Sequence, residues 1–169
     1  MRFETIHPDG DAYDGVVTHI ERNHVVLCPE RDFEFDGLMV FPKKAIKGYR
    51  DSGFESCANK LMIHNGAIGS IPHVDWLDDC GSIKEILIGL KERDIWPAIE
   101  VLFENDSEST LHIGPITAIH RTRLSLHCYD AAGNWEKVYT LDFDEIFRIE
   151  FDTKYCNHFN AYMRRYVPR

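Results

Sequence analysis

The chain has 169 residues, of which 44% are hydrophobic and 28% charged, a composition typical of a folded globular protein. Its 28 acidic and 19 basic residues give a formal charge of −9, which counts against a nucleic-acid partner because phosphate binding needs a concentrated basic face. The first ten residues lack the pattern of a signal peptide, no apolar run is long enough to span a bilayer, and the five cysteines suit reduced thiols, so we expect a cytoplasmic protein.

Residues 1–62 are predicted to form a small β unit closed by a helix. Segments rich in β-branched and aromatic residues are expected to be strands, at 2–6, 15–20, 24–28, 38–41 and 45–49. A charged turn before the fourth segment has Phe33 and Phe35 on one face. Ser52 and Glu55 have the spacing of a capping box, ahead of a helix whose apolar stripe is Phe54, Ala58 and Leu61.

Residues 63–94 are predicted to be a connector with its own helix. The first part is rich in turn signals such as Asn65-Gly66. Ser82 and Glu85 form a second capping box, and the helix that follows has one apolar face, made by Ile83, Ile86, Leu87 and Leu90. Because such a face must be buried, we expect the connector to hold the two β units in a compact pair.

Residues 95–169 are predicted to form a second β unit with a C-terminal helix. Strands are expected at 98–104, 110–120, 123–129, 135–141 and 146–151, with a polar turn at 105–109. Thr153 is expected to cap the final helix, whose apolar stripe would be Tyr155, Phe159, Tyr162, Met163 and Tyr166. The cations Arg164, Arg165 and Arg169 are interpreted as complements to the helix dipole.

The two β units nearly repeat each other. The segment 15–20 returns 99 positions later at 114–119, and Ala45-Ile46 returns 100 positions later as Glu145-Ile146. The matched positions are nearly all apolar or capping residues. The repeat therefore predicts a duplicated core rather than a duplicated site.

The repeated pattern resembles Sm-like and SH3-like small barrels, including tandem units of this kind in bacterial proteins. The residues that carry the resemblance are the segments 113–119, 130–135 and 146–151. It implies a mainly β fold with a few short helices, arranged as two five-stranded small barrels with a connecting helix. Sm proteins form rings that bind uridine-rich RNA through an Asp and Asn loop motif and a later Arg-Gly or Lys-Gly motif. Here Lys47-Gly48 is the nearest Lys-Gly pair, the second unit has Arg148-Ile149 at that place, and no matching Asp-x-x-x-Asn loop precedes either.

Motifs that would identify a reaction are missing from the sequence. Adjacent residues of a strand point to opposite faces, so His127 and Cys128 cannot both bind one ion, and Cys156 and His158 diverge on a helix. No metal and no cofactor is therefore expected. Neither a nucleophile elbow nor a phosphate-binding glycine loop is present. A hydrolase remains a hypothesis on one cluster, formed by His73, Asp75 and Asp78, although the favoured interpretation is that these acids are solvated and complement a helix N-terminus.

Aromatic residues beside turns are the strongest candidates for binding. They are Trp135, Trp76, Trp96, Phe33 and Phe35. The leading hypothesis is a non-enzymatic protein-binding module, an adaptor or an immunity-type protein, that presents these anchors on an acidic surface to another protein. The alternatives are an Sm-like RNA-binding protein and a hydrolase with a cryptic site. The sequence predicts no oligomeric state.

Overall fold

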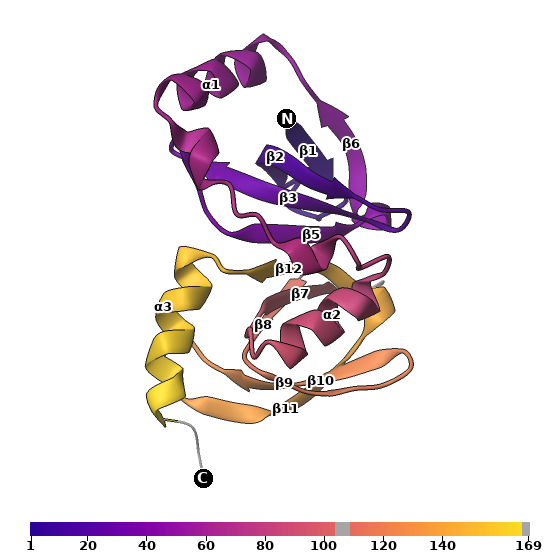
Figure 1. Cartoon of the computed structure of the whole chain (residues 1–169). Coiled ribbons are helices and arrows are strands. Elements are labelled where there is room, and N and C mark those ends of the chain that lie inside the picture. The colour runs from indigo at the N-terminus through magenta and orange to yellow at the C-terminus, as the bar shows by residue number, and fades with distance from the viewer. Residues whose placement is uncertain (104–108, 167–169) are drawn as a thin grey trace.

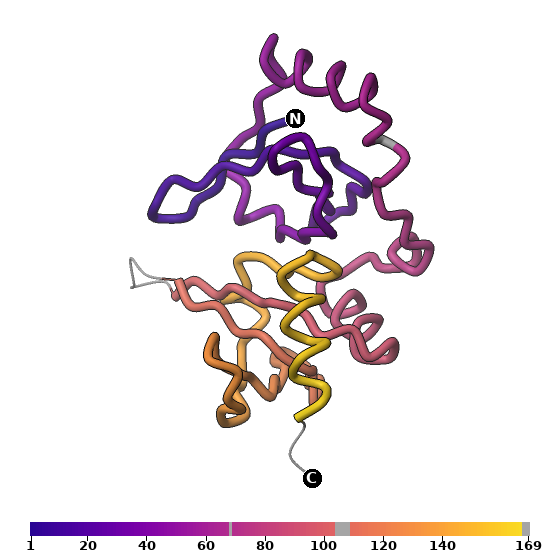
Figure 2. Tube along the Cα trace, turned by 90° about the vertical axis from the view of Figure 1, so that its left-hand side faces the viewer, coloured from indigo at the N-terminus to yellow at the C-terminus, as the bar shows by residue number. Residues whose placement is uncertain are grey.

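The structure is a computed structural model that describes residues 1–103 and 109–166, apart from the side chain of residue 68. The polar turn predicted at 105–109 therefore lies outside the described residues, except for residue 109. Arg169 also lies outside them. The chain forms two β halves stacked one above the other, with the connector beside their junction (Figures 1 and 2). Among the described residues, no helix is long and apolar enough to cross a membrane.

The first half contains six strands and a helix. Its elements are β1 (Arg2–Thr5), β2 (Ala12–Ile20), β3 (His24–Arg31), β4 (Glu34–Phe35), β5 (Leu38–Pro42), β6 (Ile46–Arg50) and α1 (Gly53–His64). The strands run antiparallel in the order β6-β1-β2-β3-β5, and β4 pairs with the end of β3. All five predicted strands are present, and the charged turn contains the additional short strand β4.

The second half follows the connector, which carries α2 (Ile83–Glu92). Its elements are β7 (Ala98–Leu102), β8 (Ser109–Ile113), β9 (Ile116–Ile119), β10 (Arg123–Tyr129), β11 (Trp135–Asp142), β12 (Ile146–Phe151) and α3 (Lys154–Met163). The long strand predicted at 110–120 is broken into β8 and β9. Gly114 adopts a φ of 149° at the break, and Pro115 has no N–H to donate to a ladder.

The halves share one pattern of strand pairing. If β8 and β9 are taken as one bent strand, the second half has the order β12-β7-β8/β9-β10-β11, which matches the first. Irregularities of register also match: the β1–β6 ladder shifts at Glu4/Thr5, and the β12–β7 ladder shifts at Ile146/Arg148. The residue passed over is Lys47 in one ladder and Phe147 in the other.

Strand β5 of the first half pairs directly with β12 of the second. The register places Val40 opposite Ile149 and Leu38 opposite Phe151. This junction makes a nine-stranded sheet that passes through both halves, while β9, β10 and β11 form a separate three-stranded sheet. Over the described residues neither sheet closes on itself. The mainly β class is confirmed, and the two closed barrels stay a prediction.

The buried stripes of α1 and α3 differ from those predicted. In α1, Glu55 and Met62 are buried, whereas Phe54 is 83% exposed. The helix is rotated because Glu55 forms an ion pair with Arg50 on β6. In α3, the buried residues are Cys156, Asn160 and Met163, while the three tyrosines of the expected stripe are exposed. Asn160 fixes this face, since its amide donates to the Trp96 carbonyl and accepts from the Tyr129 hydroxyl.

Candidate functional site

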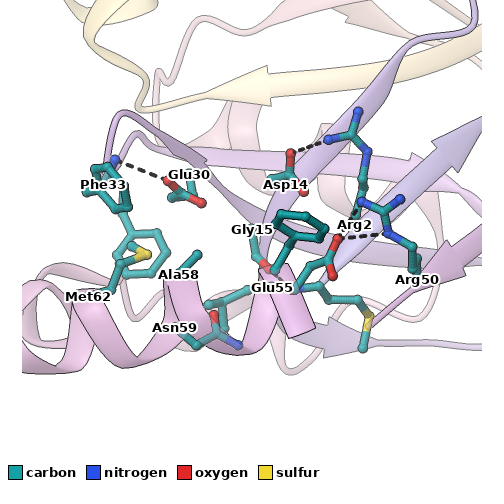
Figure 3. A pocket seen from close by; sticks show the side chains of 14 residues that line it. Arg2, Asp14, Gly15, Glu30, Phe33, Arg50, Glu55, Ala58, Asn59 and Met62 are labelled. Carbon is teal, nitrogen blue, oxygen red and sulfur yellow. Dashed lines mark hydrogen bonds and ion pairs between the residues drawn. The ribbon is translucent and has the colours of Figure 1, made fainter. Parts of the chain in front are cut away.

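A pocket lies between α1 and the strands of the first half, and we call it the α1 pocket. Its volume is about 420 Å³. Side chains from β1, β2, the β3–β4 hairpin, β6 and α1 converge on it (Figure 3). The lining combines apolar residues with ion pairs and consists of Met1, Arg2, Asp14, Gly15, Val16, Glu30, Phe33, Phe35, Arg50, Phe54, Glu55, Ala58, Asn59 and Met62.

Two ion pairs form one side of the α1 pocket. Arg2 Nη1 lies 2.9 Å from Asp14 Oδ2 across the β1–β2 ladder. Arg50 donates from Nε and Nη2 to one oxygen of Glu55, at 2.9 and 2.7 Å (Figure 3). The second Glu55 oxygen accepts from the Ser52 amide at 2.7 Å and from the Ser52 hydroxyl. The capping box therefore does more than start the helix, because its carboxylate also ties α1 to β6.

The Ser52 hydroxyl and the Arg50 guanidinium stabilise the charged form of Glu55 and lower its pKa from 4.5 to about 2. An acid whose folded pKa is depressed contributes stability above its unfolded pKa, and the contribution is lost as the pH falls through the folded pKa. We expect urea midpoints of the wild type to fall between pH 4.5 and about pH 2 partly for this reason. Glu55→Gln and Arg50→Met should both flatten that decline, and an unchanged slope in Glu55→Gln would contradict the assignment.

Phe33 occupies an unfavourable backbone conformation at the rim of the α1 pocket. Arg31 pairs with Glu34, so Asp32 and Phe33 form a two-residue hairpin turn, with φ values of 51° and 65°. Such turns favour asparagine and glycine, and a bulky side chain at positive φ is strained. The Phe33 ring is nevertheless 48% exposed, so core packing does not account for its presence. Strained residues of this kind cluster at binding and active sites.

Replacing Phe33 by asparagine is expected to raise the free energy of unfolding by about 1 kcal/mol, because asparagine tolerates the left-handed conformation. Loss of a half-exposed ring offsets only part of that gain. Urea denaturation of Phe33→Asn measures the change, with Phe103→Asn as a control at an exposed phenylalanine without a positive φ. A Phe33→Asn protein less stable than the wild type would show that the ring is held for packing.

The three tryptophans lie in other parts of the molecule. Trp96 is buried and meets Trp135 edge to face, with ring centroids 5.9 Å apart. Trp135 donates its Nε1–H to the Tyr166 carbonyl at 2.8 Å. Trp76 packs on Phe151 and lies beneath the Arg93 guanidinium. The sequence-predicted anchors thus divide: Phe33 and Phe35 line the α1 pocket, and the tryptophans pack in the connector and the second half.

The structure separates the predicted hydrolase cluster. His73 Nε2 lies 2.9 Å from Asp75 Oδ1, and both side chains are largely exposed. Asp78 instead contacts His19 on β2, with Oδ1 3.0 Å from Nε2. A general base needs a nucleophile and an orienting group within reach, and this pair lies on an open surface.

The cysteines and histidines are scattered over the fold, apart from Cys128 Sγ and His112 Nδ1, which lie 3.8 Å apart. No group of three metal-ligating side chains occurs within the part of the chain that the structure describes. Burial raises the pKa of Cys28 and Cys156 to about 11 and that of Cys128 to about 12, which keeps these thiols protonated. His127 packs on the Trp135 ring, and His158 bonds to the Lys154 carbonyl.

No protein-family model, curated protein or solved structure matches this chain. The α1 pocket is therefore interpreted from its own geometry. Its described lining contains no histidine, cysteine or serine, and each arginine is paired with a carboxylate. Such a surface supplies apolar contact and fixed charges.

Sequence reasoning identified two of the pocket residues and missed the others. Phe33 and Phe35 were visible as aromatic residues in a charged turn. Arg2, Asp14 and Arg50 carry no local signal, since they meet only when β1, β2 and β6 pair. Phe54 was placed on the predicted core stripe by the apolar spacing of its helix, so no local signal marked it as a pocket residue.

Proposed function

We propose that this protein is a non-enzymatic protein-binding module that receives an apolar side chain of its partner in the α1 pocket. The observation that carries the proposal is Phe33, an exposed aromatic ring held at positive φ at the pocket rim. Phe54 adds a second exposed ring. Aromatic residues at such positions are the usual anchors of protein interfaces, and the paired charges beside them suit a polar rim.

The formal charge of −9 favours a basic partner surface. An adaptor or an immunity-type inhibitor fits this description, and both act by occupying a partner's surface. Five cysteines, each a free thiol, support the cytoplasm as the compartment.

We further infer that the two halves are copies of one Sm-like or SH3-like five-stranded unit. Their common strand order and the matching register shifts support this inference. The turn that contributes Phe33 to the α1 pocket has no counterpart in the second half: Phe33 lies in the β3–β4 turn, whereas β10 leads to β11 through residues 130–134. The proposed site is thus specific to one copy.

Site-specific photo-crosslinking tests the proposed function. A benzophenone amino acid replaces Phe54 in the pocket or, as a matched control, Tyr162 on α3, which is 50% exposed. In lysate of the native organism, we expect one stoichiometric protein adduct from position 54 and none from position 162. The adduct should be lost with Phe33→Asn. Adducts to RNA, or equal protein adducts at both positions, would refute the proposal.

A further inference from the structure

Helix α2 covers one face of the second half. Its residues Ile86, Leu87 and Leu90 are fully buried. They belong to one apolar cluster with strand residues of that half, which include Ile99, Ile116, Leu124, Ile146 and Ile149. In Figure 1, α2 lies against these strands. The stripe of α2 that makes this contact has the spacing i, i+3, i+4, i+7, and Ile83 is its first member.

Backbone pairing identifies the equivalent face of the first half. The Phe3–Tyr49 pair of the first half corresponds to the Ile99–Ile149 pair of the second. The Ile20–Val25 pair corresponds in the same way to the Ile119–Leu124 pair. One hydrogen bond also recurs at the same distance: the Lys43 amide donates to the Asn23 carbonyl at 2.9 Å, and the Phe143 amide donates to the Thr122 carbonyl at 2.9 Å.

This equivalent face has no covering helix in the part of the chain that the structure describes, and we call it the open face. It forms an apolar pocket of about 440 Å³, lined by Met1, Phe3, Val17, Ile20, Val25, Lys43, Ile46 and Tyr49. Ile20 is 68% exposed and Tyr49 is 72% exposed, whereas Ile149, the counterpart of Tyr49, is 0% exposed. Helix α1 lies over the other pocket, and within residues 1–103 and 109–166 no helix covers the open face.

We propose that the open face binds an amphipathic helix of a partner protein, seated as α2 is seated on the second half. The second half supplies the template for the occupant, which is a short helix with isoleucine or leucine at i, i+3, i+4 and i+7. Helix-in-groove recognition uses this spacing of anchors. The exposed Ile20 and Tyr49 side chains would then be covered as their counterparts are, of which Ile149 is fully buried and Ile119 partly buried.

One substitution between the halves defines the charge of the occupant. Lys43 stands where the second half has Phe143, which packs beside the α2 cluster. Lys43 is exposed and forms no ion pair with any described residue. An ammonium group at the edge of an apolar pocket favours a carboxylate on the incoming helix. The partner helix therefore carries an acidic residue beside its apolar stripe.

Fluorescence anisotropy with labelled peptides and the full chain tests the proposal. The probes are a peptide of residues 80–94 and its variant with Lys84→Glu and Lys91→Glu. We expect both to bind, and we expect the acidic variant to bind about twofold to fivefold more tightly, the range for an exposed ion pair. Lys43→Ala should remove this preference. Ile20→Asp should weaken both peptides at least about tenfold, since it places a charge in the apolar seat.

The matched control is Leu111→Asp on β8, a 48% exposed leucine away from the open face, which should leave both affinities unchanged. Phe54→Ser should also leave them unchanged, so the outcome is independent of the proposed function of the α1 pocket. The proposal is overturned if neither peptide binds at millimolar concentration or if Ile20→Asp has no effect. Self-association that Ile20→Asp abolishes would overturn it in favour of a second copy of the chain.

Discussion

Replacing Arg148 with methionine is expected to lower the free energy of unfolding by about 3–5 kcal/mol, the cost of breaking a buried ion pair from one side. Arg148 lies on β12 between two carboxylates that are almost fully buried. Its Nε is 2.6 Å from Glu100 Oε2, and its Nη2 is 3.1 Å from Glu150 Oε1. The guanidinium also lies over the Tyr13 ring of the first half, 5.1 Å from its centroid. Methionine would fill the space and leave Glu150 without its ion pair, while Glu100 would keep only its contacts with His7 and the Ser109 hydroxyl.

The pH dependence of Arg148→Met separates lost charge compensation from lost packing. Burial already raises the pKa of Glu150 above its usual value of 4.5, and Arg148 opposes that shift. Without Arg148 the pKa of Glu150 should rise further. An acid with a raised folded pKa destabilises the fold increasingly as the pH rises from its unfolded pKa to its folded pKa. The stability that Arg148→Met loses relative to the wild type should therefore be smaller below pH 4.5 than at neutral pH.

Urea denaturation of Arg148→Met below pH 4.5 and at neutral pH provides the measurement. Arg123→Met is the control, because the Arg123–Asp142 pair has a similar contact distance, 2.7 Å against 2.6 Å for Arg148–Glu100, but is exposed. That variant should lose less than about 1 kcal/mol. Equal losses in the two variants, or a deficit in Arg148→Met that is independent of pH, would contradict this account.

Gly114→Ala is expected to destabilise the protein by about 3 kcal/mol or more, because it combines backbone strain with a clash. A Cβ at residue 114 would lie 2.1 Å from the His127 carbonyl oxygen, and the φ of 149° is unfavourable for alanine. Gly15 has the same position in the first half, where a Cβ would lie 2.3 Å from the Cys28 carbonyl oxygen. In both halves glycine allows one strand to bend closely across the next.

Thermal and urea denaturation of Gly114→Ala and Gly15→Ala measure these effects. Gly48→Ala is the matched control, since it also lies in a strand but has no atom within 4 Å of the added Cβ. We expect Gly48→Ala to stay within about 0.5 kcal/mol of the wild type. A native-like stability for Gly114→Ala would mean that the β8–β9 break can shift to accept a side chain.

Local pattern predicted most of the elements but not how they are oriented. The alternation of apolar and polar residues predicted the strands, because successive side chains on a half-buried strand point in turn to the core and to solvent. The capping-box pattern predicted the starts of α1 and α2, where Ser52 and Ser82 each accept from a backbone amide of the first turn. The rotation of α1 could not be predicted, because it depends on an Arg50–Glu55 ion pair that competes with the apolar spacing of Phe54 and Leu61.

The candidate site was predictable only where it depends on the β3–β4 turn. Phe33 and Phe35 lie in one short segment, whereas the ionic wall needs β1, β2 and β6 to be aligned in register. The open face is a different case. Its strand residues were recognised as apolar positions. Whether their side chains are exposed depends on whether a helix covers the sheet, and the sequence of a strand does not show whether a helix covers it.

The pairing of β5 with β12 has a consequence for synthesis of the chain. Val40 and Ile149 are paired, so β5 emerges from the ribosome long before its partner strand exists. Until then its apolar residues and unpaired backbone groups form an exposed edge, which is a template for aggregation. Domains that fold as they emerge reduce this hazard, but here β5 lacks one of its two neighbours until β12 has been translated. Nascent chains arrested before residue 146 should therefore depend on chaperones, and those released after β12 should not.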